Sequence, residues 1–346
     1  LGAEGDSNVT RVERGPGEPA AVAATLVRGL VGLGKTGTLG EHLRWSGHAK
    51  AGVREVVAGS VESENIVTGA GELAVERDGP SGTTILARAS HYDALALDGG
   101  PERRDFATSG VDVGLRLPAD DAREAEVEVG LRTLTWRRDH DFDWSGPLLA
   151  LELRDQVWRC HDERALDLTA RYQVELREYT GLAFTRVSCT GDPSGVCVRP
   201  TGEQRADLRH TAEAELLYTG NQVLSARYRL TVNDSSSFGS SLYRHRLDLA
   251  ATFSLPGQLF VTATLTGQLD HFPEPFLAHI DDLNQPVDSI DDENRSGVAV
   301  RVARALSKHW QVEARGAAFT DLFPRDGHGF GRQLGYLGLE WERGGD

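Results

Sequence analysis

Methionine is absent from this 346-residue chain, and cysteine occurs only three times. No run of roughly eighteen apolar residues is found, which excludes a transmembrane helix. There is no Cys-x-x-Cys pair to support a zinc or dithiol site. Basic residues are also few, 37 Lys and Arg against 52 Asp and Glu, for a net charge of -15. Because a phosphate backbone requires a basic surface, this balance argues against nucleic acid as a partner.

The length of the chain suits one or two soluble domains, or one large barrel. The chain starts at Leu1, without a charged and apolar leader. We therefore expect a mature form whose targeting segment, a signal peptide, was removed or never included. We expect no cofactor and no bound metal.

The cysteines leave one structural possibility open. Cys189 and Cys197 enclose the turn-rich stretch TGDPSGV and are close enough in sequence to form a local disulfide. Such a bond would suit an oxidising compartment, such as a periplasm or a cell surface. Cysteines at this spacing also occur together by chance, and Cys160 would be left over.

Glycine is abundant, with 39 residues, and residues 29–36 match the phosphate-loop pattern GxxxxGK[ST]. A phosphate loop must be followed by a helix whose N-terminal amides face the phosphates. Gly37, Gly40 and Gly47 interrupt that position, and each glycine inside a helix costs about 1 kcal/mol relative to alanine. The residues after Gly40 alternate between apolar and polar, which indicates a strand. We interpret the match as a coincidence within a glycine-rich strand.

From about residue 42 onward, segments of about ten residues alternate apolar and polar side chains. One such segment places Leu259, Val261 and Ala263 on one face, and Thr262 and Thr264 on the other. Convincing amphipathic helices are missing, so the pattern predicts an all-β chain of about sixteen strands. The predicted strands are roughly 1–8, 22–35, 42–55, 65–77, 83–97, 105–117, 123–136, 148–158, 165–178, 207–218, 222–232, 242–254, 258–270, 297–306, 310–320 and 332–342.

The predicted connections alternate between short and long. The short ones are 38–41, 77–82, 118–122, 219–221, 255–258 and 306–309, and the longer, polar ones are 6–19, 98–105, 137–147, 186–205, 232–241, 270–295 and 321–330. Outer-membrane β-barrels have this asymmetry, with short periplasmic turns and long outer loops. The pattern therefore favours a closed antiparallel transmembrane β-barrel. A pair of soluble β-sandwiches, which would be monodisperse without detergent, is the alternative.

Aromatic residues fall near the predicted strand ends. Trp45, Tyr218, Tyr243, Trp310 and Trp341 are the examples. Interfacial aromatic girdles occupy such positions in membrane barrels. Ordinary cross-strand packing would also explain them.

Three stretches resemble a known family. LGAEGDSNVTRV resembles the first hairpin of many Gram-negative outer-membrane β-barrels, and RQLGYLGLEW resembles their terminal strand. IDDENRSGVAVRVARALSKHWQVEARGAAF resembles a penultimate hairpin of such a barrel. The resemblance to this porin-like family implies one barrel domain over residues 1–346, insertion into outer-membrane lipid and, often, a pore. The chain departs from the family pattern because residues 342–346 follow the near-terminal aromatic Trp341.

In a barrel of this size the polar face lines the lumen. The predicted lumen-lining residues carry both signs of charge: Arg171, Arg177, Arg209, Arg227, Arg229, Arg244, Arg246, Arg301, Arg315, Glu126, Glu128, Asp167, Glu175, Asp207, Glu213, Glu215, Asp248 and Glu313. A ring of one sign selects ions, whereas a mixed wall gives weak selectivity. A solvated wall that selects nothing is the alternative.

The connection 270–295 is the longest and the most acidic. Its acidic residues include Asp281, Asp282, Asp288, Asp291, Asp292 and Glu293. It could fold onto the rim as a constriction whose carboxylates attract cations, or it could be a solvated outer loop. Calcium would need about six to eight oxygen ligands, and the spacing matches no EF-hand loop. We predict no metal site here.

Two functional hypotheses follow. The first is a passive or weakly selective pore for small hydrophilic solutes in the outer membrane of a Gram-negative bacterium. The second is a non-catalytic barrel subunit of a polysaccharide or protein export machine, or of a surface-anchored assembly, with other envelope proteins as partners. Asp139, His140, Asp141 and Asp143 share one loop, but an Asp–His pair is too common to identify a hydrolase, and we expect no enzyme.

Overall fold

The computed structural model describes residues 1–7, 21–59, 65–97, 105–120, 122–160, 164–188, 196–274, 295–320 and 330–342. It contains sixteen strands. They are β1 (Gly2–Asp6), β2 (Ala24–Leu39), β3 (Leu43–Ala58), β4 (Ile66–Asp78), β5 (Thr84–Ala96), β6 (Phe106–Pro118), β7 (Arg123–Trp136), β8 (Trp144–Cys160), β9 (Arg164–Ser188), β10 (Val196–Thr219), β11 (Gln222–Ser235), β12 (Leu242–Leu255), β13 (Leu259–His271), β14 (Ser296–Ala305), β15 (Trp310–Thr320) and β16 (Gly331–Trp341).

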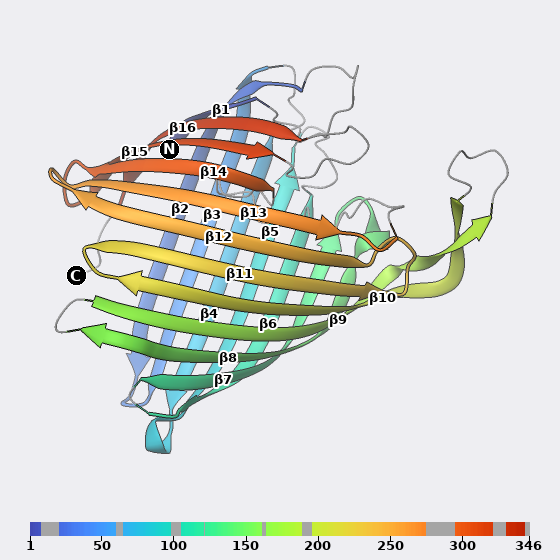
Figure 1. Ribbon diagram of the computed structural model, residues 1–346, viewed down its shortest axis with the longest axis horizontal. Coiled ribbons are helices and arrows are strands. Elements are labelled where there is room, and N and C mark those ends of the chain that lie inside the picture. The colour runs from blue at the N-terminus through green and yellow to red at the C-terminus, as the bar shows by residue number, and fades with distance from the viewer. Residues whose placement is uncertain are drawn as a thin grey trace.

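The strands form one closed antiparallel barrel (Figure 1). Each strand pairs with its neighbour in sequence, and β1 pairs with β16 from Gly2 opposite Gly338 to Asp6 opposite Leu334. The described helical segments are two 3₁₀ turns, η2 (Pro80–Gly82) and η4 (His140–Phe142). No helix in the described part of the chain is long and apolar enough to span a membrane. The predicted fold of about sixteen antiparallel strands is confirmed.

The two ends of the barrel differ in their connections. At one end the strands are joined by short segments such as 40–42, 220–221 and 256–258. At the other end the connections are longer, up to the segment 272–295 between β13 and β14. The predicted asymmetry between short turns and long loops is therefore confirmed. We call these the short-turn end and the long-loop end.

The two faces of the sheet have opposite chemistry. On β7, the side chains of Val127, Val129 and Leu131 are exposed, whereas Glu126 and Glu128 between them are buried. Successive side chains of a strand point to opposite faces, so the apolar residues share one face and the glutamates share the other. Cross-strand register extends the apolar face around the barrel. This arrangement, with an exposed aliphatic exterior on a closed barrel, is that of a transmembrane β-barrel.

Aromatic residues mark the limits of the apolar exterior. On β12, Phe253 lies near the short-turn end and Tyr243 near the long-loop end, both on the outer face. Ten residues at about 3.3 Å each, tilted by about 40°, span about 25 Å, which is the height of a bilayer-facing band. Trp310 and Trp341 face each other in register at the short-turn end. The structure places these side chains where a membrane interface requires them.

The phosphate-loop match lies within β2. Residues 29–36 pair continuously with β3, from Gly29 opposite Val53 to Thr36 opposite Ser46. Because the backbone is extended and its ladder is complete, the helix that a nucleotide site requires does not follow. The interpretation of the match as a coincidence is confirmed.

The predicted connection 186–205 is wrong in its extent. β9 continues to Ser188 and β10 begins at Val196, so both strands extend well past their neighbours (Figure 1). Pro200 and Gly202 interrupt the alternation, and the β9–β10 register shifts between Pro200 and Gln204. These breaks resemble a loop in sequence, although the pairing continues beyond them. A bulge rather than a chain reversal explains the difference.

β8 also begins earlier than predicted, at Trp144 rather than near residue 148. Gly146 and Pro147 were assigned to the connection 137–147, but both lie in the strand. The ladder to β9 runs from Ser145 opposite Glu178 to Leu148 opposite Glu175, and skips the two residues between them. Proline has no N–H to donate to a ladder, which is consistent with its place in this gap of the β8–β9 ladder.

Gly146 provides a test of the β8–β9 packing. A Cβ at this position would lie 1.6 Å from the backbone oxygen of Leu176. We expect Gly146→Ala to destabilise the folded barrel by about 1–3 kcal/mol, because one backbone must move. The fraction of protein that migrates as a compact, heat-modifiable band on a gel measures this. Gly335→Ala is the matched control, because its Cβ would meet nothing within 4 Å. Equal losses of stability from the two variants would contradict the close packing of β8 against β9 at Gly146.

Candidate functional site: the charged interior

Charged side chains line the inner face of the barrel. Arg88 on β5 pairs with Glu128 on β7, across the intervening strand β6. Side chains reach across a strand most readily on the concave face of a sheet. Cross-strand register places one row of these residues on six consecutive strands. The row runs from β7 to β12 through Glu126, Glu152, Arg171, Glu213, Arg229 and Arg246. All the predicted lumen-lining residues share this face.

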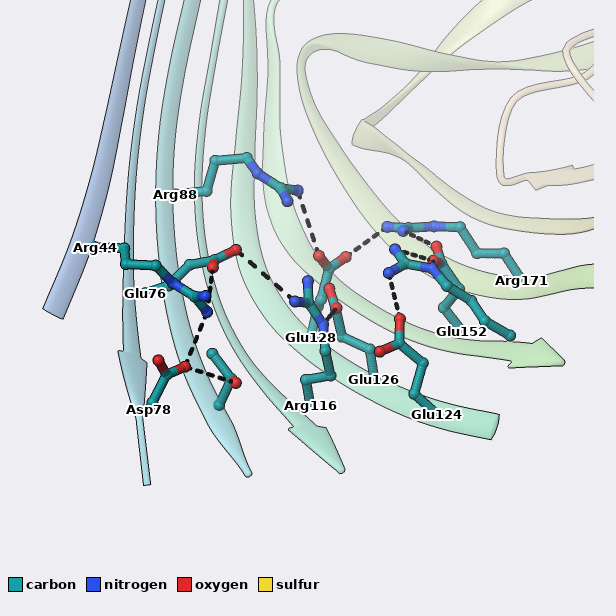
Figure 2. Close-up of polar contacts among 12 residues, drawn as sticks. Arg44, Glu76, Asp78, Arg88, Arg116, Glu124, Glu126, Glu128, Glu152 and Arg171 are labelled. Carbon is teal, nitrogen blue, oxygen red and sulfur yellow. Dashed lines mark hydrogen bonds and ion pairs between the residues drawn. The ribbon is translucent and has the colours of Figure 1, made fainter. Parts of the chain in front are cut away.

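The first part of the interior holds two neighbouring ion-pair networks on β3 to β9 (Figure 2). Glu128 accepts from Arg88 Nη1 at 3.4 Å and from Arg171 Nη2 at 2.5 Å. Arg171 also donates to Glu152 at 2.9 Å, and Glu152 accepts from Arg154 at 2.6 Å. Each carboxylate thus joins two arginines from different strands.

The second network extends from β7 toward β3. Arg116 Nε donates to Glu126 at 2.8 Å and lies 3.9 Å from Glu76. Arg44 pairs with Glu76 at 3.1 Å and with Asp78 at 2.9 Å (Figure 2). The sequence interpretation identified Glu126, Glu128 and Arg171 but missed the β3–β6 members. The alternation of polar and apolar residues in those strands could have assigned these members to the inner face.

A second group of pairs lies on β10 and β11. Arg227 pairs with Glu215 at 2.8 Å, and Arg229 donates to Glu213 at 2.6 Å. Arg227 also lies 3.5 Å from Glu213. The structure therefore brings together these four predicted residues, two of each sign.

The remaining predicted residues lie on the same face. Arg246 pairs with Asp248 at 2.9 Å, Arg244 with Asp270 at 2.7 Å, Arg301 with Glu313 and Arg177 with Glu175 at 2.7 Å. Asp207 is buried and pairs with Arg205. Asp167 accepts from Gln156 at 3.3 Å. Arg209 lies opposite Glu175, and Arg315 opposite Arg301.

A buried charge cluster at the β16–β1–β2–β3 seam was missed by the sequence interpretation. Asp6 pairs with Arg332 at 2.8 Å and with Arg54 at 3.5 Å, and Glu4 pairs with Arg28 at 2.5 Å. All five side chains are nearly inaccessible to solvent. These pairs join the first strand to the last, and so they hold the ring closed.

An aromatic cluster fills the inner face at the long-loop end of β5 to β9. Phe106 lies 5.4 Å from Trp136 and 5.8 Å from Tyr92 between ring centroids. Trp144 and Tyr179 complete the cluster, each with an arginine stacked on its ring. The sequence signal for this cluster was that its residues occupy the inward-facing positions of their alternating strands. Because these rings are buried, they pack the wall and offer no exposed surface to a solute.

The loop after β7 is held by its own polar groups. Asp143 accepts from the Trp136 N–H at 2.5 Å and shares a hydrogen bond of 2.9 Å with His140. Arg137 donates to Asp93 at 2.6 Å, and this hydrogen bond raises the pKa of Arg137. The Asp–His pair, which was too common to identify a hydrolase, is thus part of the hydrogen bonding that connects the loop to β7.

Two predictions fall wholly or partly outside the described residues. The acidic residues Asp281, Asp282, Asp288, Asp291, Asp292 and Glu293 lie outside them, as does Cys189. Cys197 is disulfide-bonded, and Cys160 is free and exposed. Within the described ranges, no group of three or more His, Cys, Asp or Glu side chains is arranged to hold a metal ion.

Comparisons with known proteins found solved structures with weak similarity to this chain. No protein-family model matches the chain, and no curated protein matches it. CdiB from Acinetobacter baumannii is 9% identical with a TM-score of 0.45, over 91% of this chain and 66% of CdiB, so the chain spans about two thirds of that protein. A substituted Rh. blastica porin is 10% identical with a TM-score of 0.39, over 98% of this chain and 97% of the porin. Salmonella typhi OmpF is 9% identical with a TM-score of 0.36, over 92% and 97%.

Proposed function

We propose that this chain is a non-catalytic outer-membrane channel of a Gram-negative bacterium, which lets small hydrophilic solutes diffuse through its interior. The observation that carries the proposal is the combination of a closed sixteen-stranded barrel, an exposed aliphatic exterior and a charged interior. An aliphatic exterior is stable in lipid, and a charged interior is stable only in water. In this orientation the short turns face the periplasm and the long loops face outward.

The chemistry of the interior supports diffusion of solutes rather than tight binding. The arginines and carboxylates in the wall are largely paired with each other, so few are left to hold a solute strongly. Many of the arginines remain partly exposed, which shows that solvent reaches the wall. A wall of this type transmits small polar solutes with modest discrimination.

A second function is favoured by the projecting ends of β9 and β10. The ladder of β8 reaches β9 only up to Tyr179, and the register with β11 begins at Asp207. Beyond those residues β9 and β10 pair mainly with each other, and they extend past the barrel (Figure 1). A paired hairpin of this kind offers a docking surface to another envelope protein, as expected of a barrel subunit in an export or surface assembly.

Single-channel recording separates these two functions. The purified full chain, added alone to a planar lipid bilayer, is expected to produce stable ohmic current steps. A subunit that depends on partners would remain closed until they were added. The control is the same preparation after heat unfolding, which should give no steps. Stable silence of folded protein, confirmed by its heat-modifiable migration, would refute the diffusion pore.

A further inference from the structure

The two signs of charge in the interior are not equally exposed to water. Arg132 is 30% exposed whereas its partner Asp112 is 0% exposed, and Arg88 is 35% exposed against 3% for Glu128. Arg301 is 41% exposed and its partner Glu313 is 16% exposed. The same order holds for Arg171, Arg154, Arg227 and Arg229 and the carboxylates with which they pair. Within these pairs the arginine side chain is the more exposed of the two.

Side-chain length explains this order. A carboxylate ends after one or two methylene groups and stays close to the wall, whereas a guanidinium ends after three methylenes and a nitrogen and extends away from the wall. Among the described residues, four pairs have the opposite order: Arg88–Glu72, Arg116–Glu76, Arg244–Asp270 and Arg246–Asp248. On β4 to β6 other pairs of the same residues keep the prevailing order, whereas both described pairs on β12 and β13 have the opposite order.

We propose that the interior acts as a radial dipole layer, positive toward the lumen, and that the pore therefore prefers small anions such as chloride, inorganic phosphate and short carboxylates. The inference rests on the proposed diffusion pore and adds the class of its solute. A wall of ion pairs has almost no net charge, but a mobile ion feels the nearer pole more strongly than the farther one. A low-dielectric barrel wall strengthens this difference, because field lines are concentrated in the aqueous lumen.

The preference is tested by the reversal potential across a bilayer that separates two KCl concentrations. At about 0.1 M salt, where the Debye length is about 10 Å, we expect chloride to be at least about twice as permeant as potassium. At about 1 M salt the Debye length falls to about 3 Å, and the ratio should approach unity. A ratio at or below unity in dilute salt would overturn the inference while leaving the pore intact. Absence of any conductance would instead refute the pore, and this inference with it.

A charge-neutral variant tests the dipole directly. Arg227→Gln, Arg229→Gln, Glu213→Gln and Glu215→Gln together remove two charges of each sign that pair with one another. The net charge is unchanged, so a mechanism based on net charge predicts no effect. The dipole layer predicts that the chloride-to-potassium ratio falls by at least about a third, because exposed guanidinium groups are lost. Adding Arg301→Gln with Glu313→Gln should lower the ratio further.

The matched control is the pair Arg123 and Asp155, which lie 3.3 Å apart on the outer face at the short-turn end. Arg123→Gln with Asp155→Asn removes one ion pair without altering the lumen, so the ratio should remain that of the unchanged protein. Heat-modifiable migration of every variant shows that it has folded. An unchanged ratio in the folded four-residue variant would overturn the dipole layer. A preference for potassium would assign selectivity to carboxylates instead.

Discussion

Replacing Asp6 by alanine is expected to lower the unfolding free energy of the closed barrel by about 3–5 kcal/mol. Asp6 is buried at the seam and pairs with Arg332 at 2.8 Å and with Arg54 at 3.5 Å. Both guanidinium groups are also buried, so the substitution removes a shared carboxylate from two positive charges in a site that water does not reach. Equilibrium unfolding by urea in lipid vesicles, followed by tryptophan fluorescence, measures the loss.

A second substitution distinguishes the loss of the pair from the loss of packing. Arg332→Met in the Asp6→Ala background also removes the buried charge that paired with Asp6, so the double variant should be more stable than Asp6→Ala alone. The exposed pair Arg123 and Asp155 is the control, because breaking an exposed pair costs about 0–1 kcal/mol. If Asp6→Ala costs no more than Asp155→Ala, the seam cluster does not hold the ring closed.

Val129→Arg is expected to destabilise the lipid-inserted protein by about 2–4 kcal/mol. Val129 lies near the middle of β7, on the exposed apolar face, opposite Val113 and Leu149 in the ladder. An arginine there would place its charge near the centre of the bilayer, away from water. The free energy of unfolding from vesicles measures the cost.

Depth provides the control for this prediction. Thr135 lies on the same face of the same strand, next to its end at Trp136. Thr135→Arg should cost about 0–1 kcal/mol, because the charge can reach the interface. Equal costs for the two variants, together with a native protein that stays dispersed without detergent, would contradict the membrane-facing exterior.

The strand pattern could be predicted closely because it depends on local chemistry. The segments 105–117, 123–136 and 310–320 correspond to β6, β7 and β15 almost residue for residue. The prediction is less accurate where glycine or proline occurs inside a pairing strand. Pro147 and Pro200 both read as loop residues, and both lie in strands where the ladder is interrupted.

The inner face could also be predicted, but its contacts could not. Alternation alone assigned Arg229 and Glu213 to one face, and the structure pairs them at 2.6 Å. The seam cluster was missed because Asp6 and Arg332 are 326 positions apart, and only closure of the ring brings them together. Sequence spacing contains no information about such a contact.

The amino-acid sequence by itself determined which residues lie on each face of the barrel. The physical reason is that a pleated strand points successive side chains in opposite directions, so a period of two in polarity becomes two chemically different surfaces. Tertiary structure alone decided which arginine meets which carboxylate. These pairings depend on the register between strands and on the curvature of the closed ring, which the pairing of β1 with β16 completes.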